Sequence, residues 1–208
     1  MKDSVYIIAG GDSLTNFDFN KLENKDVIAV NKAILSYPKA KYFITMDFTA
    51  LKKMNFKNII SDSIKIFIAN FTFDYIKEID GQIIDTRFGL VYKLEDFDMI
   101  IKSHYKESFG LDFKHFANGQ NSAYCAVQLA ISLGYKNIYL LGLDLVCDTK
   151  THYHSGYGQD IEKFKKSLNE YHKYFYFSIL ELQEKSDINI YSCSKISRLN
   201  DILKYKEI

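Results

Sequence analysis

The clearest pattern of apolar and polar positions along the chain lies between residues 121 and 144. Apolar side chains recur at helical spacing over residues 123–131, and Gly134 follows where a left-handed residue ends a helix at little cost. The segment 137–141 is apolar on both faces, which is typical of a strand in a parallel sheet covered by helices on each side. A helix, a turn and a buried strand are therefore predicted, and Asp144 comes shortly after the strand.

Apolar runs alternate with helical patterns along the rest of the chain. Further strands are predicted at residues 5–9, 27–30, 42–45, 64–68 and 188–191. A long helix with one apolar face is predicted at residues 161–185. This alternation indicates an α/β fold that is Rossmann-like, with a largely parallel sheet flanked by helices. The segment from about residue 70 to residue 116 is aromatic and mixed, and its pattern predicts no order of elements.

Polar residues and glycines follow the carboxyl ends of four predicted strands, the region in which parallel sheets bind their ligands. They are Gly10, Gly11, Asp12 and Ser13 after the first strand, Asn31 after the second, Asp47 after the third and Asp144 after the later one. These strand ends share one edge of an open parallel sheet, which is where ligands bind. Glycines let backbone N–H groups approach a phosphate or ribose. The alternatives are a tight turn for the glycine pair and helix caps for Asn31 and Asp47.

Length and composition limit the classes of protein that fit. The 208 residues suit a single α/β domain spanning residues 1–208, with a lid-like polar loop at about 146–160. No apolar run approaches the ~20 residues that span a bilayer, and the start MKDSVYIIAGG lacks the form of a signal peptide. The three cysteines show no close metal-type pairing, which fits reduced thiols and a cytoplasmic location. The net charge is +1 without a dense basic block, so nucleic acid is not expected as a partner.

Three other features of the sequence are candidate sites of chemistry. Asp96 and Asp98 imitate a DxD metal motif, but within KLEDFDMII they are interpreted as a solvated acidic face. His152 and His154 on one loop provide only two metal ligands, which is a poor site without carboxylates. Histidine also suits proton transfer near neutral pH, and His172 within the long helix is the other candidate.

Four blocks of the chain resemble a known family. VYIIAGGDSL, DVIAVNKAI, NSAYCAVQLAISLGYKNIYLLGLDL and INIYSCSKISRL are similar to segments of the bacterial sialyltransferases of glycosyltransferase family 42. They also resemble a wider group of related Rossmann-like proteins, some of them phage-encoded. The likeness is faint between about residues 55 and 116. The resemblance implies a nucleotide-binding domain that uses a CMP-sugar donor, transfers the sugar with inversion and needs no metal or other cofactor.

The resemblance also implies roles for particular residues. Nucleotide binding would fall to Gly10 and Gly11, to Asn31, to the helix start at Asn121 and Ser122, and to Asp47 near a family asparagine. The catalytic base would be His172 when counted back from the last strand, or His154 or His152 when counted forward. The family tyrosine that assists phosphate departure lies two residues after the position of Asp144 and is replaced here by Val146. Tyr153 would match the family's second lid tyrosine.

Three functions follow as hypotheses. The first is a metal-independent glycosyltransferase with a nucleotide-sugar donor, most simply a CMP-sugar, and a glycan or other hydroxyl acceptor. The second is a Mg²⁺-dependent, pyrophosphokinase-like phosphoryl transferase that would use Asp12, Asp47 or Asp144. The third is a non-catalytic nucleotide-binding module, for which Val146 is the motive. The donor sugar, the acceptor and self-association into a homo-oligomer stay open.

Overall fold

A parallel sheet forms the centre of the protein. The computed structural model describes residues 3–54, 63–69, 74–103, 116–117, 119–154 and 158–208. Among these residues, eight strands form one sheet in the order β11-β10-β9-β1-β2-β3-β4-β8, and every neighbouring pair is parallel. Their bounds are β1 Ser4–Ile8, β2 Val27–Val30, β3 Tyr42–Thr45, β4 Ile64–Ala69, β8 Met99–Lys102, β9 Asn137–Leu141, β10 Asn189–Ser192 and β11 Lys204–Tyr205. The predicted α/β fold with a largely parallel sheet is confirmed.

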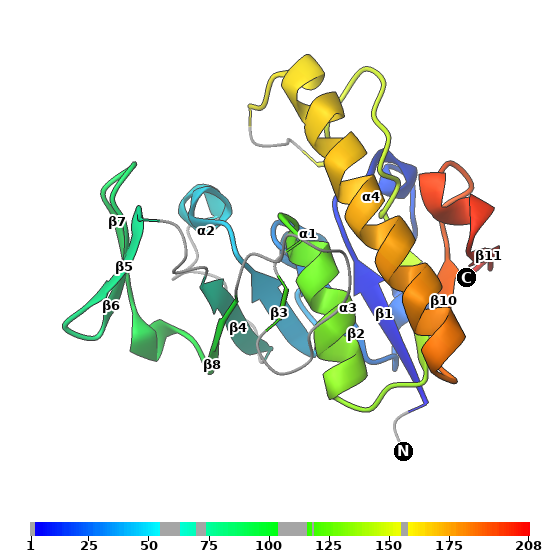
Figure 1. Cartoon of the computed structure of the whole chain (residues 1–208), viewed down its shortest axis with the longest axis horizontal. Coiled ribbons are helices and arrows are strands. Elements are labelled where there is room, and N and C mark those ends of the chain that lie inside the picture. Colours follow the sequence, from blue (N-terminus) through cyan, green and yellow to red (C-terminus); the bar gives the residue numbers. More distant parts are fainter. Residues whose placement is uncertain (1–2, 55–62, 70–73, 104–115, 118, 155–157) are drawn as a thin grey trace.

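Helices cover both faces of this sheet. Helices α3 (Ser122–Ser132) and α4 (Ile161–Lys185) lie side by side on one face (Figure 1). Helices α1 (Ala33–Ser36) and α2 (Phe48–Met54) pack with the short 3₁₀ helices η1 (Asp12–Leu14) and η2 (Phe19–Leu22) in the core of the other face. The 3₁₀ helices η4 (Leu94–Asp96) and η5 (Arg198–Asp201) complete the described helices. The long helix at 161–185 therefore has the bounds that its apolar face predicts.

The central strands are apolar on both faces because each face is buried in a separate core. Ile7 belongs to the core under α3 and α4, and its neighbour Ile8 to the core under α1 and α2. The same alternation places Ile44 on the first face and Phe43 on the second. This is the packing that continuous apolar runs predict for parallel strands.

The segment that the sequence pattern left unordered contains a second sheet. Strands β5 (Ile76–Ile79), β6 (Gln82–Asp85) and β7 (Leu90–Lys93) pair antiparallel to one another. The chain enters this sheet from β4 and leaves it through η4 to β8, at one edge of the main sheet (Figure 1). Its strands have four residues each and mix buried with exposed side chains, with Ile83 and Tyr92 among the buried ones, so their apolar pattern is weak.

The C-terminal region differs from its prediction in one element. The strand predicted at residues 188–191 is β10, and η5 follows it. The helix η5 is followed by β11, which pairs with β10 through Tyr191 and Lys204. A strand of two residues is too short to show a period of two in the sequence.

The turn after β9 gives a test of the packing at the sheet's centre. Gly142 has a φ of 65°, and a Cβ there would lie 2.6 Å from Leu14 Cδ1 and 3.2 Å from the Ala9 carbonyl oxygen. Gly134 has a φ of 84°, and a Cβ there would meet nothing within 4 Å.

We expect Gly142→Ala to lower the free energy of unfolding by about 2–4 kcal/mol, because backbone strain and overpacking add together. Gly134→Ala should cost about 1–2 kcal/mol, from backbone strain alone. Urea denaturation of both variants measures the difference. Equal losses would show that the contact with Leu14 relaxes freely.

Candidate functional site

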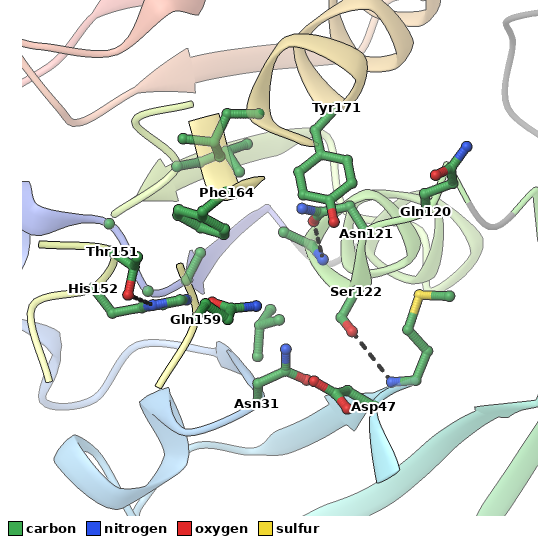
Figure 2. A pocket seen from close by; sticks show the side chains of 18 of the residues that line it. Asn31, Asp47, Gln120, Asn121, Ser122, Thr151, His152, Gln159, Phe164 and Tyr171 are labelled. Atoms are coloured by element: carbon green, nitrogen blue, oxygen red, sulfur yellow. Dashed lines mark hydrogen bonds between the residues drawn. The ribbon is translucent and has the colours of Figure 1, made fainter. Parts of the chain in front are cut away.

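A cavity of about 290 Å³ lies at the carboxyl ends of β1, β2, β3 and β9. The chain continues from β1 to β2 on one side, while β9 pairs with β1 on the other, so the cavity lies where the strand order reverses. Figure 2 shows side chains from the strand ends, the start of α3 and helix α4 around one common space. Of the residues singled out in the sequence, it is lined by Gly10, Gly11, Asn31, Asp47, Asn121, Ser122, Asp144, Val146, His152 and His154.

The glycine turn after β1 is held by a buried carboxylate. Asp144 is 1% exposed, and its two oxygens accept the Ser13 N–H at 2.9 Å and the Ser13 hydroxyl at 2.6 Å. A Cβ at Gly11 would lie 2.5 Å from Asp144 Oδ2, so only glycine permits this approach. Asp144 lines the cavity, as its place after a strand predicts, and its hydrogen bonds to Ser13 also hold the turn. Asp12 and Ser13 belong to this turn and are not among the residues lining the cavity; Asp12 pairs with Lys150 at 2.8 Å.

A buried hydroxyl orients the polar residues that follow β2 and β3. Thr45 is fully buried, donates to Asn31 Oδ1 at 2.7 Å and accepts the Asp47 N–H at 3.1 Å. Because the Asn31 oxygen faces Thr45, the amide nitrogen of Asn31 points into the cavity (Figure 2). Thr45 was not predicted as a site residue, although a hydroxyl at the end of an apolar strand is a usable signal.

The first turn of α3 faces the cavity with its positive end. Asn121 caps the helix by accepting the Ala123 N–H at 2.8 Å, and the Ser122 hydroxyl oxygen accepts the Met46 N–H at 3.2 Å. Asp47 lies opposite and caps α2, since its Oδ1 accepts the Thr49 N–H at 2.8 Å. The helix start with the Ser122 hydroxyl suits an anion, because the N-terminal end of a helix carries partial positive charge.

Two histidines from the loop after β9 pack on the glycine turn. The rings of His152 and His154 stack with centroids 4.8 Å apart. A Cβ at Gly10 would lie 2.5 Å from His152 Cδ2 and 3.5 Å from His154 Nε2, and the N–H of Tyr153 donates to the Gly10 carbonyl at 3.1 Å. The pKa of each histidine is lowered to about 4, mainly by burial; the charge of Lys32 contributes to both shifts, and His152 contributes to the shift of His154. Both imidazoles are therefore neutral at pH 7.

The other two residues predicted to be catalytic lie outside this cavity. His172 Nε2 is 3.3 Å from the Arg198 carbonyl oxygen, and burial and the Arg198 charge lower the His172 pKa. Its neighbour Tyr171 lines the cavity instead, because successive residues of a helix point about 100° apart. The hydroxyl of Tyr153 donates to Ser36 Oγ at 2.9 Å, on the α1 side of the sheet. Of the candidate bases from the sequence, His152 and His154 line this cavity and His172 does not.

Further lining residues were missed in the sequence analysis. Phe164, Leu168 and Tyr171 line the cavity from α4, at the spacing that the sequence analysis had interpreted as core packing. Tyr75 and Arg87 reach it from the three-stranded sheet, which the sequence pattern did not predict.

The candidate metal motifs have structural partners. Asp98 is half-exposed, and its carboxylate accepts the Lys65 N–H at 2.7 Å, which lowers the Asp98 pKa. Asp96 accepts the Lys93 N–H at 3.1 Å at the start of η4. The interpretation of this motif as an acidic surface is in keeping with these bonds. Within the described ranges, no three His, Cys, Asp or Glu side chains form a group that could hold a metal ion.

None of the helices in the described part of the chain combines the length and the apolarity needed to cross a membrane.

Comparisons with known proteins show a shared fold at low sequence identity. No protein-family model and no curated protein matches the chain. The sialyltransferase CstII from Campylobacter jejuni, in complex with the substrate analogue cytidine-5'-monophosphate, matches with a TM-score of 0.55 and 18% identity over 98% of this chain and 84% of that chain. Its complex with CMP-3FNeuAc matches with a TM-score of 0.54 and 19% identity over 99% and 86%. The MAf glycosyltransferase from Magnetospirillum magneticum matches with a TM-score of 0.51 and 13% identity over 100% of this chain and 35% of that chain.

Removing the carboxylate that holds the glycine turn should destabilise the protein. Asp144→Ala leaves the N–H and hydroxyl of Ser13 without their acceptors, so the free energy of unfolding should fall by about 1–3 kcal/mol. Asp12→Ala breaks a partly exposed ion pair in the same turn and should cost less than about 1 kcal/mol. Chemical denaturation measures both, and similar losses would contradict the role given to Asp144.

The stacked histidines should make stability depend on pH. Their folded pKa of about 4 lies below the ordinary value of 6.5, so the unfolded chain binds more protons between these limits. The free energy of unfolding should therefore decrease as the pH falls from 6.5 to about 4. A His152→Gln, His154→Gln double variant should show a flatter dependence in thermal melts over that window. An unchanged slope would show that the histidines are solvated in the folded protein.

Proposed function

We propose that this protein is a glycosyltransferase that moves a sugar from a CMP-sugar to a hydroxyl acceptor without a metal ion. The observation that carries the proposal is the meeting of three features in one cavity. These are a glycine turn, the positive end of α3 and a pair of neutral histidines. The fold shared with a CMP-bound sialyltransferase supports the choice of nucleotide.

The donor nucleotide would bind along the strand ends. The glycine turn lets the backbone at Gly10 and Gly11 approach the ligand closely, and the Asn31 amide adds a fixed donor. The α3 start favours the phosphate, because the Ser122 oxygen accepts a backbone N–H and its own hydrogen is left to donate. These groups are held by protein hydrogen bonds before the ligand arrives, which lowers the entropy cost of binding.

His154 is the base in this proposal. It takes the proton from the acceptor hydroxyl as the oxygen attacks the anomeric carbon, and the bond from that carbon to the phosphate oxygen breaks with its electron pair leaving on CMP. The pKa of about 4 keeps His154 unprotonated and able to accept this proton. A bound phosphate nearby would raise that pKa, so donor binding would also make the imidazole a stronger base.

A phenol from α4 is placed to assist the leaving phosphate. Tyr171 points toward the start of α3 in Figure 2, whereas the hydroxyl of Tyr153 is bonded to Ser36. A neutral phenol can donate a hydrogen bond to a phosphate oxygen as charge develops there. Burial raises the pKa of Tyr171, so this hydroxyl keeps its proton at neutral pH.

The geometry favours this function over a Mg²⁺-dependent phosphoryl transfer. Such a reaction would need carboxylates that converge on the ion. Asp144 is bonded to Ser13, Asp12 to Lys150 and Asp47 to the Thr49 N–H, so each of the three carboxylates already has a partner within the protein.

Two histidine variants distinguish the candidate bases. With a panel of CMP-sugars in the presence of a chelator, His154→Gln should lower sugar transfer by about 10²–10⁴-fold. The same variant should still bind CMP, as measured by thermal shift. His172→Gln should keep transfer near the wild-type rate, because His172 lies against Arg198.

Three outcomes would contradict the proposal. Turnover that survives in His154→Gln would show that His154 is not the base. Turnover that disappears when the chelator is added would favour a metal-dependent reaction. Stabilisation by CMP without turnover of any CMP-sugar would leave a nucleotide-binding module.

A further inference from the structure

The three-stranded sheet brings one cation to the cavity. Among the described lining residues, Arg87 is the one arginine, and no lysine lines the cavity. Arg87 lies in the turn between β6 and β7, beside the lining residues Tyr75 and Ile76 of the same sheet. In the main sheet, β4 and β8 at the edge connect to this small sheet, so Arg87 approaches from the side opposite to β9.

A fully buried carboxylate fixes the orientation of this arginine. Asp85 is 0% exposed, and its Oδ1 accepts the backbone N–H and the Nε–H of Arg87, each at 3.0 Å. Its Oδ2 accepts from Nη2 at 2.6 Å. The guanidinium carbon also lies 3.7 Å from the centre of the Tyr75 ring. One edge of the guanidinium is thus held by Asp85 and one face by Tyr75.

The remaining edge of the guanidinium is available to a ligand. Its second amino group, Nη1, has no hydrogen-bond partner among the described residues, and the side chain is 46% exposed. Arginine binds carboxylates and phosphates through such fixed, charge-assisted N–H donors. Asp47 also lies near enough to attract Arg87 electrostatically. An anion would therefore bind a guanidinium whose charge is already partly balanced by Asp85 and Asp47.

We propose that Arg87 forms an acceptor subsite that binds an anionic group, a carboxylate or a phosphate, on the hydroxyl acceptor. This inference rests on the proposed glycosyl transfer. The groups assigned to the donor are the glycine turn after β1, Asn31 after β2 and the start of α3. Arg87 is half-exposed at the other side of the cavity, where a second substrate enters from solvent. Asp85 and Tyr75 act through Arg87 as positioning residues.

Binding of matched saccharides tests the subsite without any catalysis. The probes are methyl β-D-glucuronide, glucose 6-phosphate and the neutral methyl β-D-glucoside, each titrated by NMR into the CMP-saturated protein. We expect at least one charged probe to bind the wild type about tenfold more tightly than the neutral one. The stronger of the two charged probes identifies the anion as carboxylate or phosphate.

Variants assign this preference to Arg87. Arg87→Met should remove it, and a double variant with Asp85→Asn avoids leaving a buried carboxylate unpaired if the single variant folds poorly. Lys77→Met is the matched control, because Lys77 is exposed on β5 of the same sheet and does not line the cavity. The control should keep the preference. Asp85→Asn alone should weaken it, because the guanidinium is then held less firmly.

Kinetics separate this inference from the proposed function. With an anionic acceptor, Arg87→Met should raise the acceptor KM about tenfold with a smaller change in kcat, whereas Lys77→Met should change neither. A wild type that binds the charged probes through Arg87 but transfers no sugar would overturn the proposed function and keep the subsite. Equal affinity for charged and neutral probes, no binding of either charged probe, or a preference that survives Arg87→Met would overturn the subsite.

Discussion

The buried carboxylate of Asp144 joins the two turns on which the cavity is built. It accepts two hydrogen bonds from Ser13, and it comes so close to Gly11 that a side chain there would collide with it. This contact ties the end of β9 to the turn after β1 at the centre of the sheet. The loop histidines pack against Gly10, and the N–H of Tyr153, which lies between them in the sequence, donates to the Gly10 carbonyl. This connection therefore holds in place the glycine turn against which the loop histidines pack.

The polar groups around the cavity are oriented by bonds made within the protein. Thr45 occupies the Asn31 oxygen and turns the amide nitrogen inward, and the Met46 N–H occupies the Ser122 oxygen. Arg87 is oriented in the same way, because Asp85 accepts hydrogen bonds from its Nε and Nη2 and not from its Nη1. Burial and the charge of Lys32 keep the stacked histidines neutral. The site is therefore prepared to accept protons and to donate hydrogen bonds to an anionic ligand.

The sequence predicted the elements whose side chains repeat with a clear period. Strong examples are the strands β2 and β3, in which every residue is buried, and the helix at 161–185, in which each turn adds an apolar side chain to one face. The sheet β5–β6–β7 and the strand β11 were not predicted. Their strands have four residues or fewer and mix buried with exposed side chains, so hydrogen bonds to neighbouring strands set their order and no long apolar pattern marks them.

The sequence by itself determined the parallel sheet and the gathering of strand-end residues at one edge, since both follow from strand direction and burial. Only the tertiary structure decided which of those residues face the ligand space. In the folded protein Asp144 bonds to Ser13, Tyr171 lines the cavity and His172 lies against Arg198. Arg87 also lines the cavity, although its segment has no clear apolar pattern. The reason is physical: a residue's element follows from local periodicity, but the direction of its side chain depends on partners far away in the chain.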